Sequence, residues 1–189
     1  MALILVCTAE KLSICFRIYQ DGMRSTTTGL ASSLNFSWLI DSEIAGARGP
    51  RLPEHLQFLR QQGIRVLVRM SDRPSVSNKD IQRLDMIDYH EPVPDMTAPS
   101  IQCLRDMVRF IQKCLSEDKP VCVTCDGGYG RTATLLTCYM ITEGLDFDNA
   151  IKLVKKKRPG SVLTIEQQEA VEQYSLQQML NPPSIIPEE

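Results

Sequence analysis

Apolar and polar residues alternate along this chain with two different periods. Short apolar runs at residues 36–40, 64–70 and 120–124 are bounded by turn residues and predict buried strands. Longer segments carry apolar residues three and four positions apart, which predicts amphipathic helices; one such stripe comprises Ile101, Leu104, Val108, Ile111 and Leu115. Strands and helices therefore follow one another, and this order is typical of an α/β fold with a central, mostly parallel, twisted sheet flanked by helices.

Proline and glycine residues indicate the bounds of the first elements. A short polar turn separates residues 36–40 from residues 43–45, which predicts a hairpin and hence an antiparallel strand at the edge of the sheet. Pro53 stands where proline is tolerated at the start of a helix, and Gly63 stands just past the expected end of that helix. We therefore expect a helix over residues 53–62.

Further helices are expected towards the end of the chain. Residues 132–141 predict a helix directly after the strand at 120–124. Another helix should begin near Asp148 and end with the basic run at residues 155–158. Positive side chains at that end complement the helix dipole, so we expect this run to face water. A patch that binds phosphoinositides or an acidic partner is the other interpretation.

The chain divides into three parts. Residues 34–180 are enough for one compact domain. Residues 1–33 form an N-terminal extension to which no role can be assigned, and residues 25–29 within it predict a flexible linker. Residues 181–189, with three prolines, predict a flexible tail. The apolar stretch at residues 1–7 is far too short to span a bilayer, so no membrane span is expected.

Composition and charge argue against several classes of protein. The net charge of −2 provides no general basic surface, so nucleic acid is not an expected partner. The seven cysteines are odd in number and several lie in apolar segments, a pattern of reduced thiols in the cytoplasm or the nucleus. Neither His55 nor His90 stands in a metal-ligand spacing with these cysteines, so no metal is expected. We expect a monomer.

The segment between the strand at 120–124 and the following helix carries the candidate chemistry. Cys125 follows the strand and stands before the helix N-terminus, where unpaired N–H groups and the helix dipole favour an anion. The same position favours a thiolate over a thiol, above all beside the guanidinium of Arg131. A glycine-rich turn that merely contains a cysteine and an arginine is the alternative interpretation.

The rest of this segment is suited to binding a phosphoryl group. Its glycines permit positive φ and leave no Cβ in the way, so that successive amides can surround phosphoryl oxygens. Arg131 would supply a planar guanidinium that binds two of those oxygens. The candidate phosphate-binding residues are therefore Asp126, Gly127, Gly128, Tyr129, Gly130 and Arg131.

A thiol that attacks phosphorus needs an acid to protonate the departing oxygen, and Asp95 is the candidate. It lies in residues 91–100, where three prolines exclude a regular helix and favour a semi-rigid loop. The helical stripe that begins at Ile101, with Ser100 as its N-cap, would anchor this loop. An ordinary turn aspartate is the alternative interpretation.

These motifs together resemble the cysteine-dependent protein tyrosine phosphatase superfamily, and its small atypical dual-specificity members most closely. The pattern Cys-x5-Arg-Thr follows a short strand, and a Pro-x-Pro-Asp loop precedes the cysteine by 30 residues. The resemblance runs from about residue 34 to about residue 174. Further stretches that agree with this subgroup are residues 35–38, 45–46, 50–53, 158–161 and 166–167.

The resemblance implies a role for each residue of the motif. Cys125 would be the nucleophile, Arg131 the phosphate clamp and Asp95 the general acid. Thr132 would supply the hydroxyl that assists departure of the thiolate. The implied reaction is hydrolysis of a phosphorylated protein or peptide in two steps, through a cysteinyl-phosphate, without metal or other cofactor. Because no insertion deepens the pocket, we expect both phosphotyrosine and phosphoserine or phosphothreonine to be accepted.

The sequence departs from the family pattern at Thr124, since the residue before the nucleophile is usually histidine. Threonine offers a hydroxyl but no charge, so the thiolate should be held less firmly than in relatives. The carboxylate of Asp126 would act in the same direction unless it points away. A phosphoprotein-binding pseudophosphatase with weak or no turnover is therefore the alternative function. Sulfur transfer on a rhodanese-like loop is a third, but it leaves Asp95 unexplained.

Two residues near the end of the domain have more than one interpretation. Thr164 and Gln167 predict a capping box, in which Gln167 returns a hydrogen bond to the cap residue. Some relatives use a glutamine near this position to orient the hydrolytic water, which is the alternative. Glu166 could instead brace the phosphate loop, and the sequence does not decide between these roles.

Overall fold

The computed structural model describes residues 29–180 of the chain. The predicted tail at 181–189 and residues 1–28, which include nearly all of the predicted linker, lie outside the described residues. The sheet consists of β1 (Ser37–Ile40), β2 (Ile44–Arg48), β3 (Val66–Ser71), β4 (Ile87–Val93) and β5 (Val121–Cys125). The described helices are α2 (Gly29–Ser33), α3 (Pro53–Gln61), α4 (Asn78–Gln82), α5 (Ile101–Ser116), α6 (Gly130–Thr142), α7 (Phe147–Lys157) and α8 (Ile165–Leu180).

The five strands lie in the order β1-β2-β5-β3-β4, with β5 at the centre of the sheet. Strand β1 pairs with β2 in the antiparallel sense, and the other three pairs are parallel. The predicted α/β class, with a mostly parallel sheet and an antiparallel edge hairpin, is therefore confirmed. Because β5 is central and parallel to its neighbours, its carboxyl end lies at the middle of the sheet edge where α/β proteins place their ligands.

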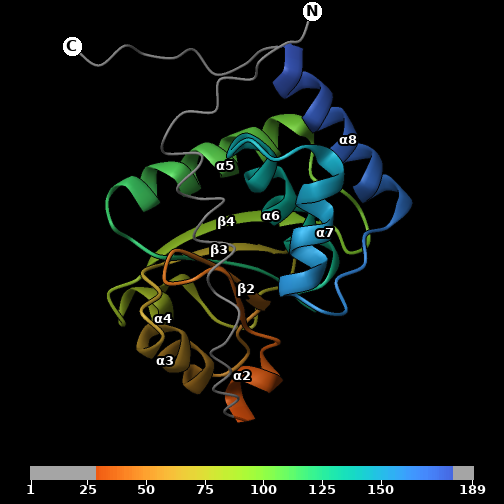
Figure 1. The fold of residues 1–189 in the computed structure, drawn as a ribbon. Helices are drawn as coiled ribbons and strands as arrows, with labels where there is room; N and C mark the ends of the chain where they lie inside the picture. Colours follow the sequence, from red (N-terminus) through yellow and green to blue (C-terminus); the bar gives the residue numbers. More distant parts are fainter. Residues whose placement is uncertain (1–28, 181–189) are drawn as a thin grey trace, which may run out of the picture.

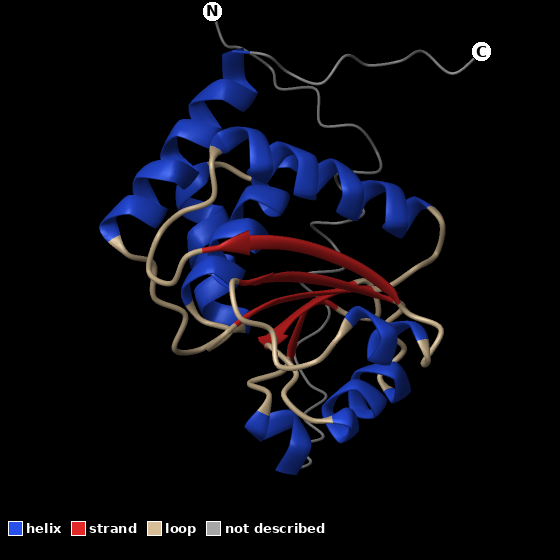
Figure 2. Cartoon of the chain, turned by 180° about the vertical axis from the view of Figure 1, so that it is seen from behind, coloured by secondary structure: helices blue, strands red, loops and turns tan. Residues whose placement is uncertain are grey.

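Helices cover both faces of the sheet (Figure 1). In the two opposite views, α5, α6, α7 and α8 lie on one side, and α2, α3 and α4 lie on the other (Figures 1 and 2). The alternation along β5 matches these two layers. Val121, Val123 and Cys125 belong to the core beneath α5–α8, whereas Cys122 belongs to the core beneath α3 and α4.

Two elements were not expected from the sequence. Strand β4 ends only at Val93, so that it includes the first part of the loop predicted at 91–100. Its residues are mostly half-buried or exposed, which removes the apolar run that predicted the other strands. Pro92 is compatible with it because β4 is an edge strand. Helix α4 has only five residues, and a capping box between Ser77 and Asp80 begins it.

The basic run at residues 155–158 does not face water throughout, which corrects the prediction. Lys155 and Lys156 are exposed, but Arg158 is only 1% exposed. Helix α7 ends at Lys157, and Pro159 prevents it from continuing. The chain turns at this point, so Arg158 enters the interior.

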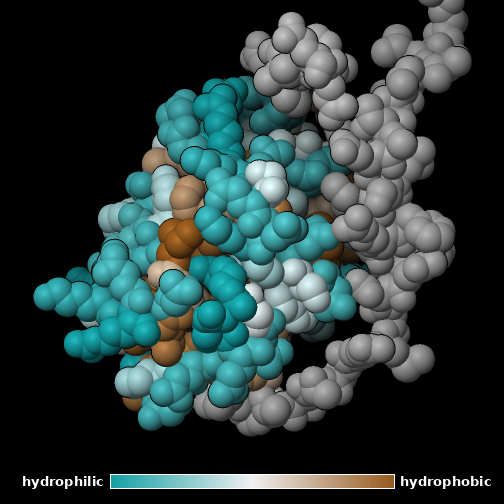
Figure 3. Space-filling view, turned by 90° about the vertical axis from the view of Figure 1, so that its left-hand side faces the viewer, coloured by the Kyte–Doolittle hydropathy of each residue, from teal (hydrophilic) through white to brown (hydrophobic). Residues whose placement is uncertain are grey.

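One face of the described part of the chain is mainly polar. Figure 3, seen from the left of Figure 1, shows hydrophilic residues over most of the described surface, with smaller hydrophobic areas between them.

The packed structure begins ahead of β1. Ala31 and Leu34 pack into the core beneath α3, although Ala31 lies within the predicted N-terminal extension. Within residues 29–180, no helix is both long and apolar enough to cross a membrane.

Candidate active site

The carboxyl end of β5 delivers Cys125 to the loop that precedes α6. Cys125 is the last residue of β5, and α6 begins at Gly130. The Sγ atom of Cys125, whose residue is only 3% exposed, accepts a hydrogen bond from the backbone N–H of Gly128 at 3.2 Å. The loop of residues 125–130, which we call the phosphate loop, thus folds back over the sulfur, and an amide directed at sulfur stabilises negative charge on it.

Two glycines of the phosphate loop lie close to neighbouring elements, and at Gly128 glycine is required. Gly128 has φ +77°, and a Cβ on it would lie 2.6 Å from the backbone nitrogen of Arg48 and 2.7 Å from the carbonyl of Ala47. A Cβ on Gly130 would lie 2.7 Å from Oε1 of Gln167. The loop is therefore pressed against the backbone at the end of β2, an approach that only glycine permits, and lies against the side chain of Gln167 on α8.

Arg131 joins the phosphate loop to the loop of Asp95. The side chain of Arg131 is 2% exposed, and its Nη2 donates to Oδ1 of Asp95 at 2.7 Å and to Oδ2 of Asp126 at 2.6 Å. Nη1 donates to the carbonyls of Met70 and Val93, at the ends of β3 and β4. The guanidinium of Arg131, the predicted clamp, therefore contacts both the predicted acid, Asp95, and Asp126, which follows the predicted nucleophile.

The charges of this group support one another. Burial alone lowers the pKa of Arg131, but its contacts with Asp126, Cys125 and Asp95 outweigh burial and raise the pKa above its ordinary value. Burial likewise raises the pKa of Asp126, yet hydrogen bonds from Ser71 and Arg131 hold that pKa below its ordinary value. Asp126 does not point away from the site, and at neutral pH it is a carboxylate that Arg131 and Ser71 hold.

Two threonines beside Cys125 differ in their hydrogen bonds. The hydroxyl of Thr124, in a residue that is 1% exposed, donates to the carbonyl of Val68 on β3 at 3.3 Å. It therefore supports the sheet and gives no hydrogen bond to the phosphate loop. The hydroxyl of Thr132 is buried without a hydrogen-bond partner among the described residues. Thr132 thus has a hydroxyl that is available to a group at the site.

The predicted capping box at the start of α8 is present. The N–H of Gln167 donates to Oγ1 of Thr164 at 3.2 Å, and the N–H of Thr164 donates to Oε1 of Gln167 at 3.1 Å. The same Gln167 donates through Nε2 to the carbonyl of Thr97 at 2.9 Å. Gln167 therefore links the cap of α8 to the loop that carries Asp95, while its Oε1 lies against Gly130.

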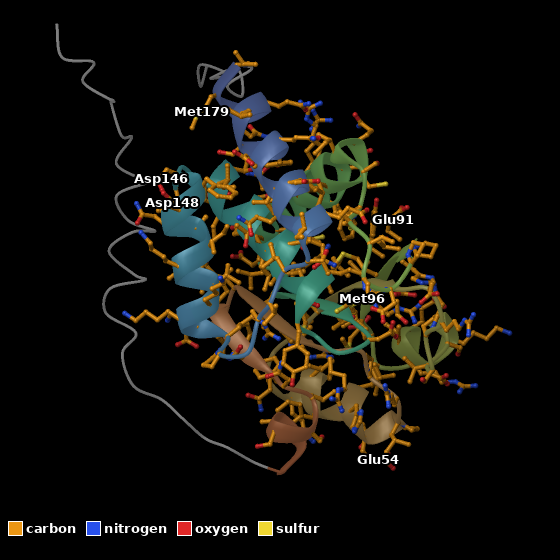
Figure 4. The ribbon with its side chains drawn as sticks, turned by 90° about the vertical axis from the view of Figure 1, so that its right-hand side faces the viewer. Glu54, Glu91, Met96, Asp146, Asp148 and Met179 are labelled. Atoms are coloured by element: carbon orange, nitrogen blue, oxygen red, sulfur yellow. The ribbon has the colours of Figure 1, made fainter. Side chains whose placement is uncertain are left out.

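Glu166 braces the loop of Asp95, and the structure records no hydrogen bond between it and the phosphate loop. Its Oε1 accepts a hydrogen bond from the N–H of Ala98 at 3.0 Å, and the hydroxyl of Thr164 donates to the carbonyl of Met96 at 3.3 Å. Figure 4, seen from the right of Figure 1, shows Met96 near the middle of the view, beside the helices. The start of α8 thus positions the loop of Asp95 through several hydrogen bonds.

Arg158 is a residue of this site that the sequence did not single out. Its guanidinium donates to the carbonyl of Gly128 at 2.8 Å and to that of Asn35 at 3.1 Å, to the hydroxyl of Ser37 at 2.8 Å, and to the carbonyl of Gly46. A Cβ on Gly46 would lie 2.8 Å from that guanidinium. The sequence signal for Arg158 was the pair Pro159–Gly160 that follows it. This pair ends the helix, so the cation before it does not lie on the exposed surface of the helix.

Comparisons with known proteins agree with this arrangement. The family model described as "Polymorphic toxin system, DSP-PTPase phosphatase" matches residues 46–145, more than half of the chain. The chain therefore belongs to the DSP-PTPase phosphatases of the cysteine-based protein tyrosine phosphatase superfamily, as the sequence motifs predicted. The matched residues contain the phosphate loop, Arg131 and Asp95.

Individual relatives match most of the described domain. Protein tyrosine phosphatase domain-containing protein 1 of Mus musculus is 29% identical over 160 residues, which cover 74% of this chain and 21% of the mouse protein. Tyrosine-protein phosphatase cdc-14 of Caenorhabditis elegans is 27% identical over 153 residues, which cover 73% of this chain and 21% of that protein. The chain thus spans about a fifth of the length of these two relatives.

Solved structures confirm the fold. The crystal structure of Tk-PTP in the active form superposes with a TM-score of 0.70 and 28% sequence identity, over 75% of this chain and 97% of that chain. The crystal structure of PTPMT1 also superposes with a TM-score of 0.70, but at 18% identity this likeness concerns the fold alone. The five-stranded, mostly parallel sheet with flanking helices is therefore the fold of dual-specificity phosphatases.

Proposed function

We propose that this chain is a phosphoprotein phosphatase that hydrolyses phosphotyrosine and phosphoserine or phosphothreonine through a cysteinyl-phosphate. The observation that carries this proposal is the position of the Arg131 guanidinium. It binds Asp126 of the phosphate loop, five residues earlier, and Asp95, 36 residues earlier in the chain. An acid, an anion clamp and a cysteine at a helix N-terminus are thereby gathered at one sheet edge.

In the first chemical step, the sulfur of Cys125 attacks phosphorus, and a sulfur–phosphorus bond replaces the bond from phosphorus to the side-chain oxygen of the substrate. The carboxyl group of Asp95 gives its proton to the departing oxygen. Arg131 binds two phosphoryl oxygens and stabilises the charge that they carry in the transition state. For this, its Nη2 must exchange the carboxylates of Asp95 and Asp126 for the phosphate.

In the second step, water attacks phosphorus, the carboxylate of Asp95 accepts a proton from that water, and the sulfur of Cys125 departs as a thiolate. The buried hydroxyl of Thr132 donates to the departing sulfur, a role that its lack of another partner in the described residues supports. The N–H of Gly128, which already donates to this sulfur, stabilises the same charge. Inorganic phosphate is the product.

Dual specificity rests on the short loops at the site. Asp95 has a side chain that is 69% exposed, so the loop that carries it does not enclose the substrate in a deep pocket. A shallow site accepts both the long phosphotyrosine and the short phosphoserine or phosphothreonine side chain. Turnover of matched phosphotyrosine and phosphothreonine peptides tests this, and a preference for phosphotyrosine above about a thousandfold, or roughly 4 kcal/mol, would contradict it.

The alternative is a pseudophosphatase that binds phosphoproteins with weak or no turnover. The observation that favours it is the hydroxyl of Thr124, which bonds to Val68 and leaves the phosphate loop without the support that the usual histidine provides. The anion-binding residues would then hold a phosphorylated side chain without cleaving it.

Hydrolysis of para-nitrophenyl phosphate separates the two functions. Cys125→Ser should lower turnover by about a thousandfold or more, because the variant lacks the nucleophile. Cys103→Ser is the matched control, since Cys103 is another free cysteine, on α5. Equal rates for the unaltered chain and Cys125→Ser would reject the enzyme and favour the binding protein.

A further inference from the structure

A small polar cavity lies beside the phosphate loop, on the side away from α8. Thr124 and Asp126 form its inner wall. Three arginines also line it, namely Arg51, Arg69 and Arg73, together with Ser71, Ser75, Gly49, Pro50, Pro74 and Val76. The proposed function uses none of these arginines.

Both outer arginines are held close to the phosphate loop by the backbone next to them. The N–H of Gly49, two residues before Arg51, donates to the carbonyl of Cys125 at 2.6 Å. The N–H of Arg73 donates to the hydroxyl of Ser71 at 3.3 Å, and that hydroxyl donates to Asp126. Arg51 and Arg73 therefore stand at the rim of the site on two separate segments, each of which contacts the loop.

Of the three arginines, only Arg69 forms an ion pair within residues 29–180. Arg69 is buried and forms an ion pair with Asp88 at 2.5 Å. Arg51 and Arg73 are exposed, and within residues 29–180 neither guanidinium forms an ion pair or a hydrogen bond. They are thus two cations without a direct ion pair in this part of the chain, although Arg51 lies close enough to Asp126 for its charge to help lower the pKa of that carboxyl.

Two carboxylates near these arginines make their ion pairs with Arg131 instead. Asp126 lines the same cavity, but Arg131 and Ser71 already bind its two oxygens. Asp72 lies 3.9 Å from Arg131. An anion supplied from outside the chain is therefore the group that Arg51 and Arg73 can bind.

We propose that Arg51 and Arg73 form a second anion subsite, which binds an acidic or phosphorylated residue close to the phosphorylated residue of a peptide substrate. This inference rests on the proposed function and adds the substrate class to it: acidic phosphopeptides. Two exposed cations contribute modestly, so we expect a preference of about 3- to 10-fold in kcat/KM, which salt screens.

The test uses three phosphotyrosine peptides that differ only in whether glutamate, alanine or lysine flanks the phosphotyrosine. The measured quantity is the ratio of kcat/KM between the glutamate and alanine peptides, because any general change in rate cancels from it. The ratio should be about 3 to 10 for the unaltered chain and should fall towards 1 in Arg51→Gln/Arg73→Gln. Arg109→Gln, an exposed arginine on α5, is the matched control and should keep the ratio.

Several outcomes would overturn the proposal. One is a ratio near 1 for the unaltered chain, and another is a ratio that the double variant retains. A separate arm of the experiment measures release of phosphate from vesicles that contain phosphatidylinositol phosphates. If only that arm depends on Arg51 and Arg73, the anion is a lipid headgroup and the peptide proposal is wrong.

The proposed function can fail separately from this inference. If no substrate is hydrolysed, the affinities of the three peptides for the unaltered chain are measured by fluorescence polarisation. A preference for the glutamate peptide that the double variant loses would support the subsite in a binding protein. Equal affinities would reject the subsite.

Discussion

The guanidinium of Arg158 donates a hydrogen bond to the carbonyl oxygen of Gly128 at 2.8 Å. The N–H of Gly128 donates in turn to the sulfur of Cys125. Arg158, one residue beyond the end of α7, is thus connected to the candidate nucleophile through a single residue of the phosphate loop, Gly128. Burial lowers the pKa of Arg158, and the carbonyl oxygens that surround the guanidinium accept its hydrogen bonds.

Arg158→Lys should weaken both the fold and the site. Lysine keeps the charge but cannot reach all the acceptors of the planar guanidinium, so buried carbonyls such as those of Gly46 and Gly128 are left unsatisfied. We expect the free energy of unfolding to fall by about 1–3 kcal/mol, measured by urea denaturation. We also expect kcat to fall, measured where the variant is fully folded. Lys156→Met, on the exposed face of α7, is the control, and equal losses in both variants would refute the role of Arg158.

Gly128→Ala should be far more damaging than Gly63→Ala. Both glycines have positive φ, so alanine costs about 1–2 kcal/mol of backbone strain at either position. At Gly63 nothing lies within 4 Å of the added Cβ, whereas at Gly128 backbone atoms of Ala47 and Arg48 lie within 2.7 Å. Thermal unfolding and turnover of the two variants measure the difference. Similar losses in both would mean that the phosphate loop does not need its close approach to β2.

Asp126→Asn should remove stability that depends on pH. The folded pKa of Asp126 is below its ordinary value of 3.8, so its ionised form contributes stability above that pH, and the contribution is lost as pH falls through the folded pKa. The variant should therefore be less stable than the unaltered chain at neutral pH, and the difference should shrink below about pH 4. Denaturation curves at several pH values measure it. A difference in stability between Asp126→Asn and the unaltered chain that stays constant over this pH range would contradict the prediction.

Thr124→His should increase turnover if the missing histidine limits the enzyme. A charged imidazole beside Cys125 would favour the thiolate, and one hydrogen bond to a charged group accounts for a gain of about tenfold or more. Steady-state hydrolysis of para-nitrophenyl phosphate measures it. Thr124→Val, which keeps the shape of threonine without a hydroxyl, controls for loss of the bond to Val68. A folded histidine variant without a gain would indicate a loop adapted to threonine.

Much of the fold was predictable because its signals are local. The apolar stripe of α5 with its cap at Ser100, the capping box of Thr164 and Gln167, and the glycine after α3 each depend on neighbouring residues. Strand β4 was not predictable in this way. It lies at the sheet edge with half-exposed residues, so its conformation depends on pairing with β3, which no local pattern reports.

The features of the site also divide into those that depend on neighbouring residues and those that depend on the tertiary structure. The order of thiol, glycines and guanidinium in residues 125–131 was enough, by itself, to predict an anion site between a strand and a helix, and the strand and helix are present. Only the tertiary structure decided which groups surround it: Asp95 and Asp126 on Arg131, Arg158 beneath Gly128, and Arg51 and Arg73 at the rim. The reason is physical, since a strand-to-helix turn depends on residues next to one another. The contacts of Arg131 with Asp95 and of Arg158 with Gly128 join residues 36 and 30 positions apart, which meet only when the sheet assembles.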